Sequence, residues 1–215
     1  MTLELRNVAL SLNGAALIEP FSLLIEAGEI VTLMGPSGCG KSSLLSHVAG
    51  DLAPPLEGRG DIMLGGVKME KTPPELRHIG RLFQDDLLFP HLTVGENILF
   101  GLPRGLKLER REMMRTALQR ADLEGFENRA PHTLSGGQRA RVSLMRALMA
   151  KPRVMLLDEP LNKLDKDLRN SMRNYVFGHL KARNIPCLLV THDIEDAPTG
   201  GRVFWIDNRK ELTLA

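Results

Sequence analysis

The sequence predicts an α/β protein with a mostly parallel sheet, covered by helices, and a helical segment inserted into its middle. Short apolar runs alternate with helix-like segments along the first and last thirds of the chain, as in parallel sheets covered on both faces. Residues 85–150 have a mostly helical character instead. At 215 residues the chain can form one large domain with a subdomain. We therefore expect a single domain, with its α/β core in 1–84 and 151–215 and a helical subdomain in 85–150.

The first part of the chain is expected to hold most of the strands. The run EIVTLM is the strongest strand candidate because it is β-branched and apolar and ends at Gly35. A helix should follow it, closed by Gly50. The strands predicted here are 3–10, 21–26, 29–34, 61–66 and 78–83, and the helix is 41–50.

The second part of the chain is expected to alternate long helices with buried strands. Prolines at 90, 103 and 131 place loops within the helical middle. A helix follows from Gly136 onward, since the segment after it is rich in Leu, Met, Ala and Arg. Beyond it we predict strands at 154–158, 187–191 and 202–207 and a helix over 164–184.

Charge and composition exclude several classes of protein. The 28 Lys and Arg against 26 Asp and Glu give a net charge of +2, which offers no case for nucleic-acid binding. Cys39 and Cys187 are far apart, so a disulfide framework is not indicated and a reducing cytosol is expected. The N-terminus does not have the pattern of a signal peptide, and no apolar run is long enough to span a membrane. A membrane role would therefore need a partner.

The segment GPSGCGKSS fits the pattern G-x-x-x-x-G-K-[ST] and lies between a predicted strand and a predicted helix. Its glycines let successive backbone N–H groups point at an anion, and the following helix adds its positive end. Lys41 would bring a full charge to the phosphates, and the Ser42 hydroxyl suits Mg²⁺. Cys39 is interpreted as a small loop residue rather than a reactive thiol. The predicted nucleotide-binding residues are Gly35, Pro36, Ser37, Gly38, Cys39, Gly40, Lys41, Ser42 and Ser43.

Two carboxylates follow the buried strand VMLLD, at the edge where ligands bind in open α/β sheets. Asp158 suits a Mg²⁺ ion, and Glu159 could act as general base toward a water that attacks the γ-phosphate. Taken alone, the pair could be two acids in a turn before Pro160. Beside a phosphate-binding loop, nucleotide chemistry is the better interpretation.

The segment LSGGQ raises a separate question because it places two glycines where a helix begins. Ser135 and Gln138 match a capping box, which explains those two residues as a helix start. It does not explain Gly136 and Gly137, since each glycine costs about 1 kcal/mol against alanine in a helix. Bare glycine amides at a helix N-terminus allow an anion to approach closely. We therefore expect a second phosphate-binding helix end.

With these segments in order, the chain resembles the ATP-binding subunits of ABC transporters over essentially its whole length. GPSGCGKSS is similar to Walker A, LSGGQ to the signature, and VMLLDEP to Walker B. Gln84 stands at the Q-loop, Asp165 at the D-loop and His192 at the switch histidine. The resemblance implies a P-loop NTPase core with an additional antiparallel β-subdomain and an inserted helical subdomain.

The resemblance also implies how the sites work. Two copies would pack head to tail around two ATP molecules, with Ser135, Gly136, Gly137 and Gln138 of one copy closing over nucleotide held by the other. Gln84, Ser42 and Asp158 would serve Mg²⁺. Glu159, His192, Lys41 and Gln84 would be catalytic, and Asp165 would link the two sites.

Two positions depart from the family pattern. Leu12 stands near the place where an aromatic residue usually stacks on adenine, which affects base binding. Asn162 and Lys163 stand where the D-loop usually has small residues, which could alter communication between the two sites.

The resemblance favours an importer. The segment LLFPHLTVGENI is similar to the corresponding segment of uptake ATPases for thiamine, iron, sulfate or polyamines. This resemblance implies permease subunits and a periplasmic binding protein as partners. A groove in this segment would then receive a permease helix. From the pattern alone, the segment could instead be the start of a buried helix with its loop. The expected location is cytoplasmic, on the inner face of the plasma membrane. A soluble ABC-type ATPase not coupled to transport and a binding module without turnover remain alternatives.

Overall fold

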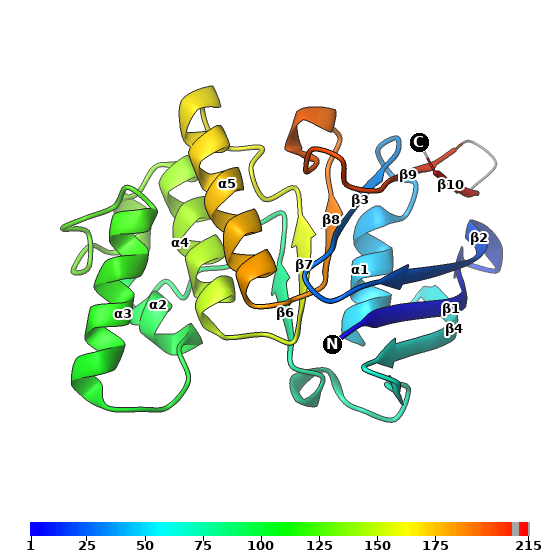
Figure 1. Cartoon of the computed structure of the whole chain (residues 1–215), viewed down its shortest axis with the longest axis horizontal. Helices are drawn as coiled ribbons and strands as arrows, with labels where there is room; N and C mark the ends of the chain where they lie inside the picture. The colour runs from blue at the N-terminus through cyan, green and yellow to red at the C-terminus, as the bar shows by residue number, and fades with distance from the viewer. Residues whose placement is uncertain (208–210, 215) are drawn as a thin grey trace. The chain divides into compact units, whose positions relative to one another are not determined.

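The computed structural model describes residues 1–207 and 211–214 (Figure 1). The chain forms two compact units that are described separately here. The first unit consists of Met1–Arg81, Arg153–Glu159 and Phe177–Ala215, and the second of Leu82–Pro152 and Pro160–Val176.

The described strands form two sheets. The first is antiparallel, in the order β2-β1-β4-β5, and the second has the order β10-β9-β3-β8-β7-β6. In the second sheet β3 pairs in parallel with β8 and β9, and β7 with β8, whereas β10 is antiparallel to β9. The strands are β1 (Leu3–Leu12), β2 (Ala15–Ile25), β3 (Ile30–Met34), β4 (Leu56–Leu64), β5 (Val67–Lys68), β6 (Ile79–Leu82), β7 (Val154–Asp158), β8 (Cys187–Val190), β9 (Val203–Ile206) and β10 (Leu212–Leu214).

Helix α1 (Lys41–Ala49) packs within the first unit beside the strands of both sheets, as Figure 1 shows. Its Leu44, Leu45 and Val48 are at most 1% exposed and join strand residues of both sheets in one core. Strands β3, β7 and β8 are buried along their whole length, which explains why they are continuous apolar runs rather than alternating ones. Because these three strands are parallel, the residues that follow their carboxyl ends lie at the same edge of the sheet.

Three helices of the second unit lie against one another (Figure 1). They are α2 (Val94–Gly101), α3 (Lys107–Arg120) and α4 (Gly136–Met149). Both α2 and α4 begin with a complete capping box, at Thr93 and Ser135 respectively. Short 3₁₀ turns occur at Pro74–Leu76, Pro131–Thr133 and Ile194–Asp196. No helix within the described residues is long and apolar enough to cross a bilayer.

Helix α5 (Lys166–Ala182) belongs to both units, with its first part in the second unit. The division differs from the expected one, in which everything after residue 150 belonged to the core. The segment Pro160–Val176 joins the helical unit because its start packs on α4: a Cβ at Gly137 would lie 2.9 Å from the Lys163 carbonyl oxygen. A sequence pattern does not report that long-range contact.

The helices and strands expected in the core are present, with bounds shifted by a few residues. Strand β2 begins at Ala15 rather than near 21, and β4 begins at Leu56 rather than 61. Both extensions pair with β1, so a neighbouring strand rather than local apolarity sets their lengths. The short strands β5 and β10 were not predicted, because two or three residues carry no periodicity.

Candidate nucleotide site

The predicted phosphate-binding loop joins β3 to α1 in the first unit. Gly40 caps α1 with φ 100° and Gly35 has φ 152°, both in the region that favours glycine. A Cβ at Gly35 would lie 2.9 Å from the Ile206 backbone oxygen, so the loop passes too close to β9 for any side chain. The helix end itself has no side-chain cap, which leaves its amides for an anion.

Lys41 is folded against the loop that precedes it. Its Nζ donates to the carbonyl oxygens of Gly35 and Pro36, each at 2.8 Å, and the residue is only 8% exposed. The ammonium group is thus held at the loop, among backbone atoms that an anion would approach. This placement fits the predicted contact with phosphate.

Asp158 is the most buried carboxylate of the site, at 4% exposure. Burial raises its pKa, while a hydrogen bond from Ser42 and the positive charges of Arg81 and Lys41 act in the opposite direction. The Ser42 hydroxyl and the Asp158 carboxylate therefore meet beside Lys41. Two hard oxygen ligands in contact match the donors that Mg²⁺ takes near phosphates. Among the described residues no cluster of three or more His, Cys, Asp or Glu could hold a metal ion.

Glu159 and His192 face each other at the ends of β7 and β8. His192 Nδ1 lies 3.3 Å from Glu159 Oε1, with the histidine side chain 62% exposed and the glutamate 19%. The Glu159 backbone has φ 48° and its N–H donates to the Val190 carbonyl at 2.9 Å. Such a conformation is unfavourable for a glutamate by about 1 kcal/mol or more. It persists because the hydrogen bond from the Glu159 N–H to Val190 fixes the Glu159 backbone at the end of β8. His192, which follows β8, lies beside the Glu159 carboxylate as a result.

Arg81 is a residue that sequence reasoning missed. Its guanidinium bonds both Asp51 carboxylate oxygens, at 2.6 and 2.8 Å, and donates to Ser46 Oγ at 2.8 Å. Its charge also favours the ionised form of Asp158. An arginine within a strand-like run carries no motif, so only the tertiary structure could reveal it.

The signature segment begins α4 in the second unit. Ser135 Oγ accepts from the Gln138 N–H at 3.2 Å, and Gln138 Oε1 accepts from the Ser135 N–H at 2.9 Å, so the predicted capping box is confirmed. Among the described residues the Gly136 and Gly137 N–H groups have no hydrogen-bond acceptor. The two glycines differ, however. A Cβ at Gly136 would meet only the tip of Arg139, at 3.8 Å, whereas Gly137 is packed against the Lys163 backbone.

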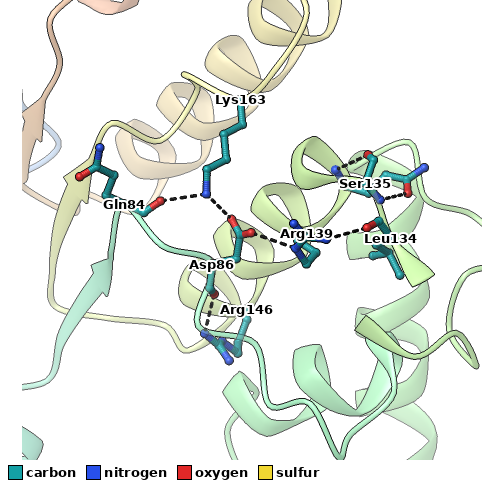
Figure 2. A network of polar contacts seen from close by, with 8 residues as sticks. Gln84, Asp86, Leu134, Ser135, Arg139, Arg146 and Lys163 are labelled. Atoms are coloured by element: carbon teal, nitrogen blue, oxygen red, sulfur yellow. Dashed lines mark hydrogen bonds and ion pairs between the residues drawn. The ribbon is translucent and has the colours of Figure 1, made fainter. Parts of the chain in front are cut away.

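The Q-loop and D-loop residues also lie in the second unit (Figure 2). The Gln84 carbonyl accepts from Lys163 Nζ at 3.1 Å. Asp165 Oδ1 accepts from the Leu168 N–H at 3.1 Å and so caps α5. The predicted D-loop residue therefore has a structural task of its own.

The predicted site residues thus fall into two groups. The first unit brings the loop 35–43 together with Asp158, Glu159 and His192, and the second holds Gln84, residues 135–138 and Asp165. Leu12 is 40% exposed at the end of β1, whereas the apolar side chains of Leu17 and Ile18 in β2 pack on Gly40. Cys187 is fully buried in β8, where burial raises the pKa of its thiol, so it takes no part in the site.

Comparison with known proteins gives the family of the chain. The family described as ABC transporter matches residues 18–162. The chain is 45% identical over 212 residues to the Escherichia coli ABC transporter ATP-binding protein YnjD, covering 96% of this chain and 98% of that one. It is 45% identical to the E. coli putrescine transport ATP-binding protein PotG and to an E. coli Fe(3+) ions import ATP-binding protein, FbpC. These two matches cover 99% and 90% of this chain, which spans 56% of the length of each relative.

A solved structure with the same fold is the dimeric structure of a bacterial ABC transporter cassette, MJ0796. It is 31% identical, covers 98% of this chain and 96% of its own, and superposes with a TM-score of 0.84. A second structure of that cassette, in a post-hydrolysis state bound to ADP and phosphate, matches with the same TM-score of 0.84.

Fold and site together define an ATP-binding cassette with a P-loop core, which confirms the predicted fold class. The chain belongs to the ABC transporter family. It is an ATP-binding subunit that hydrolyses ATP, as the resemblance implied.

Proposed function

We propose that this subunit powers uptake of a solute across the bacterial inner membrane by ATP-driven closure of a homodimer. The observation that carries the proposal is the assembly of Ser42, Asp158, Glu159 and His192 around the phosphate-binding loop of the first unit. A carboxylate that suits a cation, a second carboxylate paired with an imidazole, and a lysine at a loop of bare amides are the groups that phosphoryl transfer needs.

Binding of the triphosphate is assigned to residues 35–43. Lys41 would exchange its contacts with the Gly35 and Pro36 carbonyls for the β- and γ-phosphates, since an anion is a stronger partner than a carbonyl. Ser42 and Asp158, with Gln84, would hold Mg²⁺, which neutralises charge on the phosphates when bound. Leu17 offers apolar contact beside Gly40.

Hydrolysis is assigned to Glu159 and His192. The Glu159 carboxylate would accept a proton from the attacking water, because it lies beyond the buried Asp158 and remains 19% exposed. His192, within 3.3 Å of that carboxylate, would orient the water and contact the γ-phosphate.

The second half of each site is assigned to a second copy of the chain. The Ser135 hydroxyl and the Gly136 and Gly137 amides would meet the nucleotide held by the partner's loop. The MJ0796 cassette, at 31% identity, is described as dimeric, which supports this arrangement. Asp165 would connect the two sites.

Uptake is assigned from the relatives. Proteins named for polyamine and iron import are 42–45% identical to this chain, although their solutes are chemically unlike. The sequence similarity therefore reflects the shared ATP-hydrolysing function rather than the transported solute. We assign a pair of transmembrane permease subunits as partners, with a periplasmic binding protein in the same system, and a position at the inner face of the plasma membrane. In the second unit, Leu87 and Phe100 are 55% and 67% exposed, and we assign them to the surface that contacts the permease helix.

The test is the substitution Glu159→Gln, which keeps shape and removes the base. We expect phosphate release to fall by about two orders of magnitude or more, the range for loss of a general base, while ATP still produces dimers in size-exclusion chromatography. Gln is also free of the charge that opposes nucleotide phosphates. A hydrolysis rate equal to that of the unchanged protein would exclude Glu159 as the base.

A further inference from the structure

Lys163 reaches from the D-loop to the Q-loop within the second unit (Figure 2). Its Nζ donates to the Gln84 carbonyl at 3.1 Å and lies 3.2 Å from Asp86 Oδ1. The residues that usually precede Leu-Asp in a D-loop are small. A small side chain at position 163 could not reach from the D-loop backbone to the Gln84 carbonyl or the Asp86 carboxylate. The contact is therefore a feature of this chain rather than of the motif.

Asp86 is held by two cations, one on each oxygen. Arg139 Nε lies 3.3 Å from Oδ2, whereas Lys163 contacts Oδ1. The Asp86 side chain is only 12% exposed, whereas the two cations are 33% and 38% exposed. Screening by solvent is weaker for such a half-enclosed triad than for a surface pair. We name Lys163, Asp86 and Arg139 the lysine bridge.

The far end of the lysine bridge contacts the signature segment. Arg139 donates to the Leu134 carbonyl at 2.7 Å, one residue before the Ser135 cap (Figure 2). The backbone of Lys163 itself packs on Gly137, whose Cβ, if present, would lie 2.9 Å from the Lys163 oxygen. Lys163 thus contacts the Q-loop with its side chain and the signature helix with its main chain.

The Q-loop backbone beside Asp86 is under strain. Leu87 adopts φ 41°, which a leucine takes rarely, and it is 55% exposed, so burial of its side chain does not compensate. Such a conformation persists only when the surrounding contacts determine it. The two cations on Asp86 are contacts of that kind.

We propose that Lys163 is a positioning residue for ATP hydrolysis. Through the lysine bridge it holds the Gln84 segment and the Ser135 segment in one geometry, so that a displacement of either motif by nucleotide is transmitted to the other. The inference rests on the proposed function, because it concerns the motifs that complete the two ATP sites.

The experiment compares ATP hydrolysis by the unchanged protein and by Lys163→Met, which nearly keeps the length of the side chain and removes its charge. We expect kcat to fall about fivefold, the middle of the range for residues that couple sites. The KM for ATP should stay unchanged, because the lysine bridge includes no residue of the loop 35–43. Lys163→Arg should recover most of the rate, since its guanidinium can reach the same oxygens. The melting temperature should stay within about 2 °C of the unchanged protein in both variants.

Two further variants separate positioning from a general effect of charge. Lys166→Met removes an exposed lysine three residues along, which forms no ion pair among the described residues, and should leave kcat unchanged. Asp86→Asn should lower kcat as Lys163→Met does, and the double variant should be no slower than either single one.

The inference is overturned if Lys163→Met hydrolyses ATP at the unchanged rate, if Lys166→Met loses as much, or if the two effects multiply in the double variant. A rise in KM with kcat intact would also overturn it, because that pattern signals lost nucleotide binding. Absence of hydrolysis by the unchanged protein would instead defeat the proposed function itself, and with it the inference.

Discussion

At the scale of single residues, the site depends on one carboxylate, that of Asp158, held in surroundings that do not favour its charge. Asp158 is buried in a strand end between Ser42 and Glu159, and its pKa is raised mainly by that burial. Protein sites that bind cations often have this character, because the groups that hold a ligand are not arranged for stability alone. Glu159 adds backbone strain at the neighbouring position.

Asp158→Asn should therefore stabilise the fold while abolishing hydrolysis. The native pKa of Asp158 lies above its ordinary value of 3.8, so the folded state binds more protons above that pH and loses stability as pH rises. The variant should resist urea better than the unchanged protein at pH 7. This advantage should shrink as pH falls toward 3.8.

The measurement is urea unfolding between about pH 4 and 8, the range in which a raised carboxyl pKa changes stability, with Glu57→Gln as the control. Glu57 is an exposed carboxylate on β4 in the same unit, so this control removes one surface charge of the same kind. An Asp158→Asn curve that ran parallel to the control would show that burial does not oppose this charge.

At the scale of elements, the beginning of α4 combines two tasks that one sequence motif conceals. Gly137 is required by the fold, because the Lys163 backbone occupies the space of its Cβ. Gly136 has no such neighbour, and its bare amide is free for a ligand. Besides the proposed contact with phosphate, Gly137 therefore permits close packing within the chain.

Alanine at each glycine should separate these tasks. We expect Gly137→Ala to lower the free energy of unfolding by about 1–3 kcal/mol, as overpacking does. Gly136→Ala should instead leave stability unchanged or raise it by up to about 1 kcal/mol, because alanine favours helices. Both should slow hydrolysis if the amides meet nucleotide. Urea unfolding and a phosphate-release assay would report the two effects, and equal stability losses would contradict the packing argument.

At the scale of the whole molecule, the two groups of site residues have to meet across a dimer for the proposed cycle to run. The residues proposed to hold phosphate lie in the first unit and those of the signature segment in the second. If each nucleotide lies between the phosphate loop of one copy and the signature of another, a defect in one segment can be complemented by a copy that keeps it.

Mixing Lys41→Met with Ser135→Arg tests this directly. Each variant alone should be inactive, since both sites of either homodimer carry the defect. In an equal mixture about half of the dimers are mixed, and each has one intact site, so about a quarter of the normal rate should return. Mixing Lys41→Met with Gly40→Arg, which alters the same segment, is the control and should recover nothing. A mixture that stayed inactive would argue against sites shared between copies.

Much of this protein was readable from its sequence because the chemistry depends on contiguous segments. The loop 35–43, the pair at 158–159 and the box at 135–138 each carry their geometry within a few residues, so spacing alone predicts it. The buried strands β3, β7 and β8 were equally visible, because strands covered on both faces are apolar throughout.

Only the tertiary structure decided which residues support those segments. Three contacts join residues that are far apart along the chain: Arg81 with Asp158, Asp86 with its two cations, and Lys163 with Gly137. Spacing in the sequence predicts none of these contacts. The reason is physical: local backbone preference and hydrophobic period act over a few residues, whereas ion pairs and close packing depend on where the folded chain brings distant atoms together.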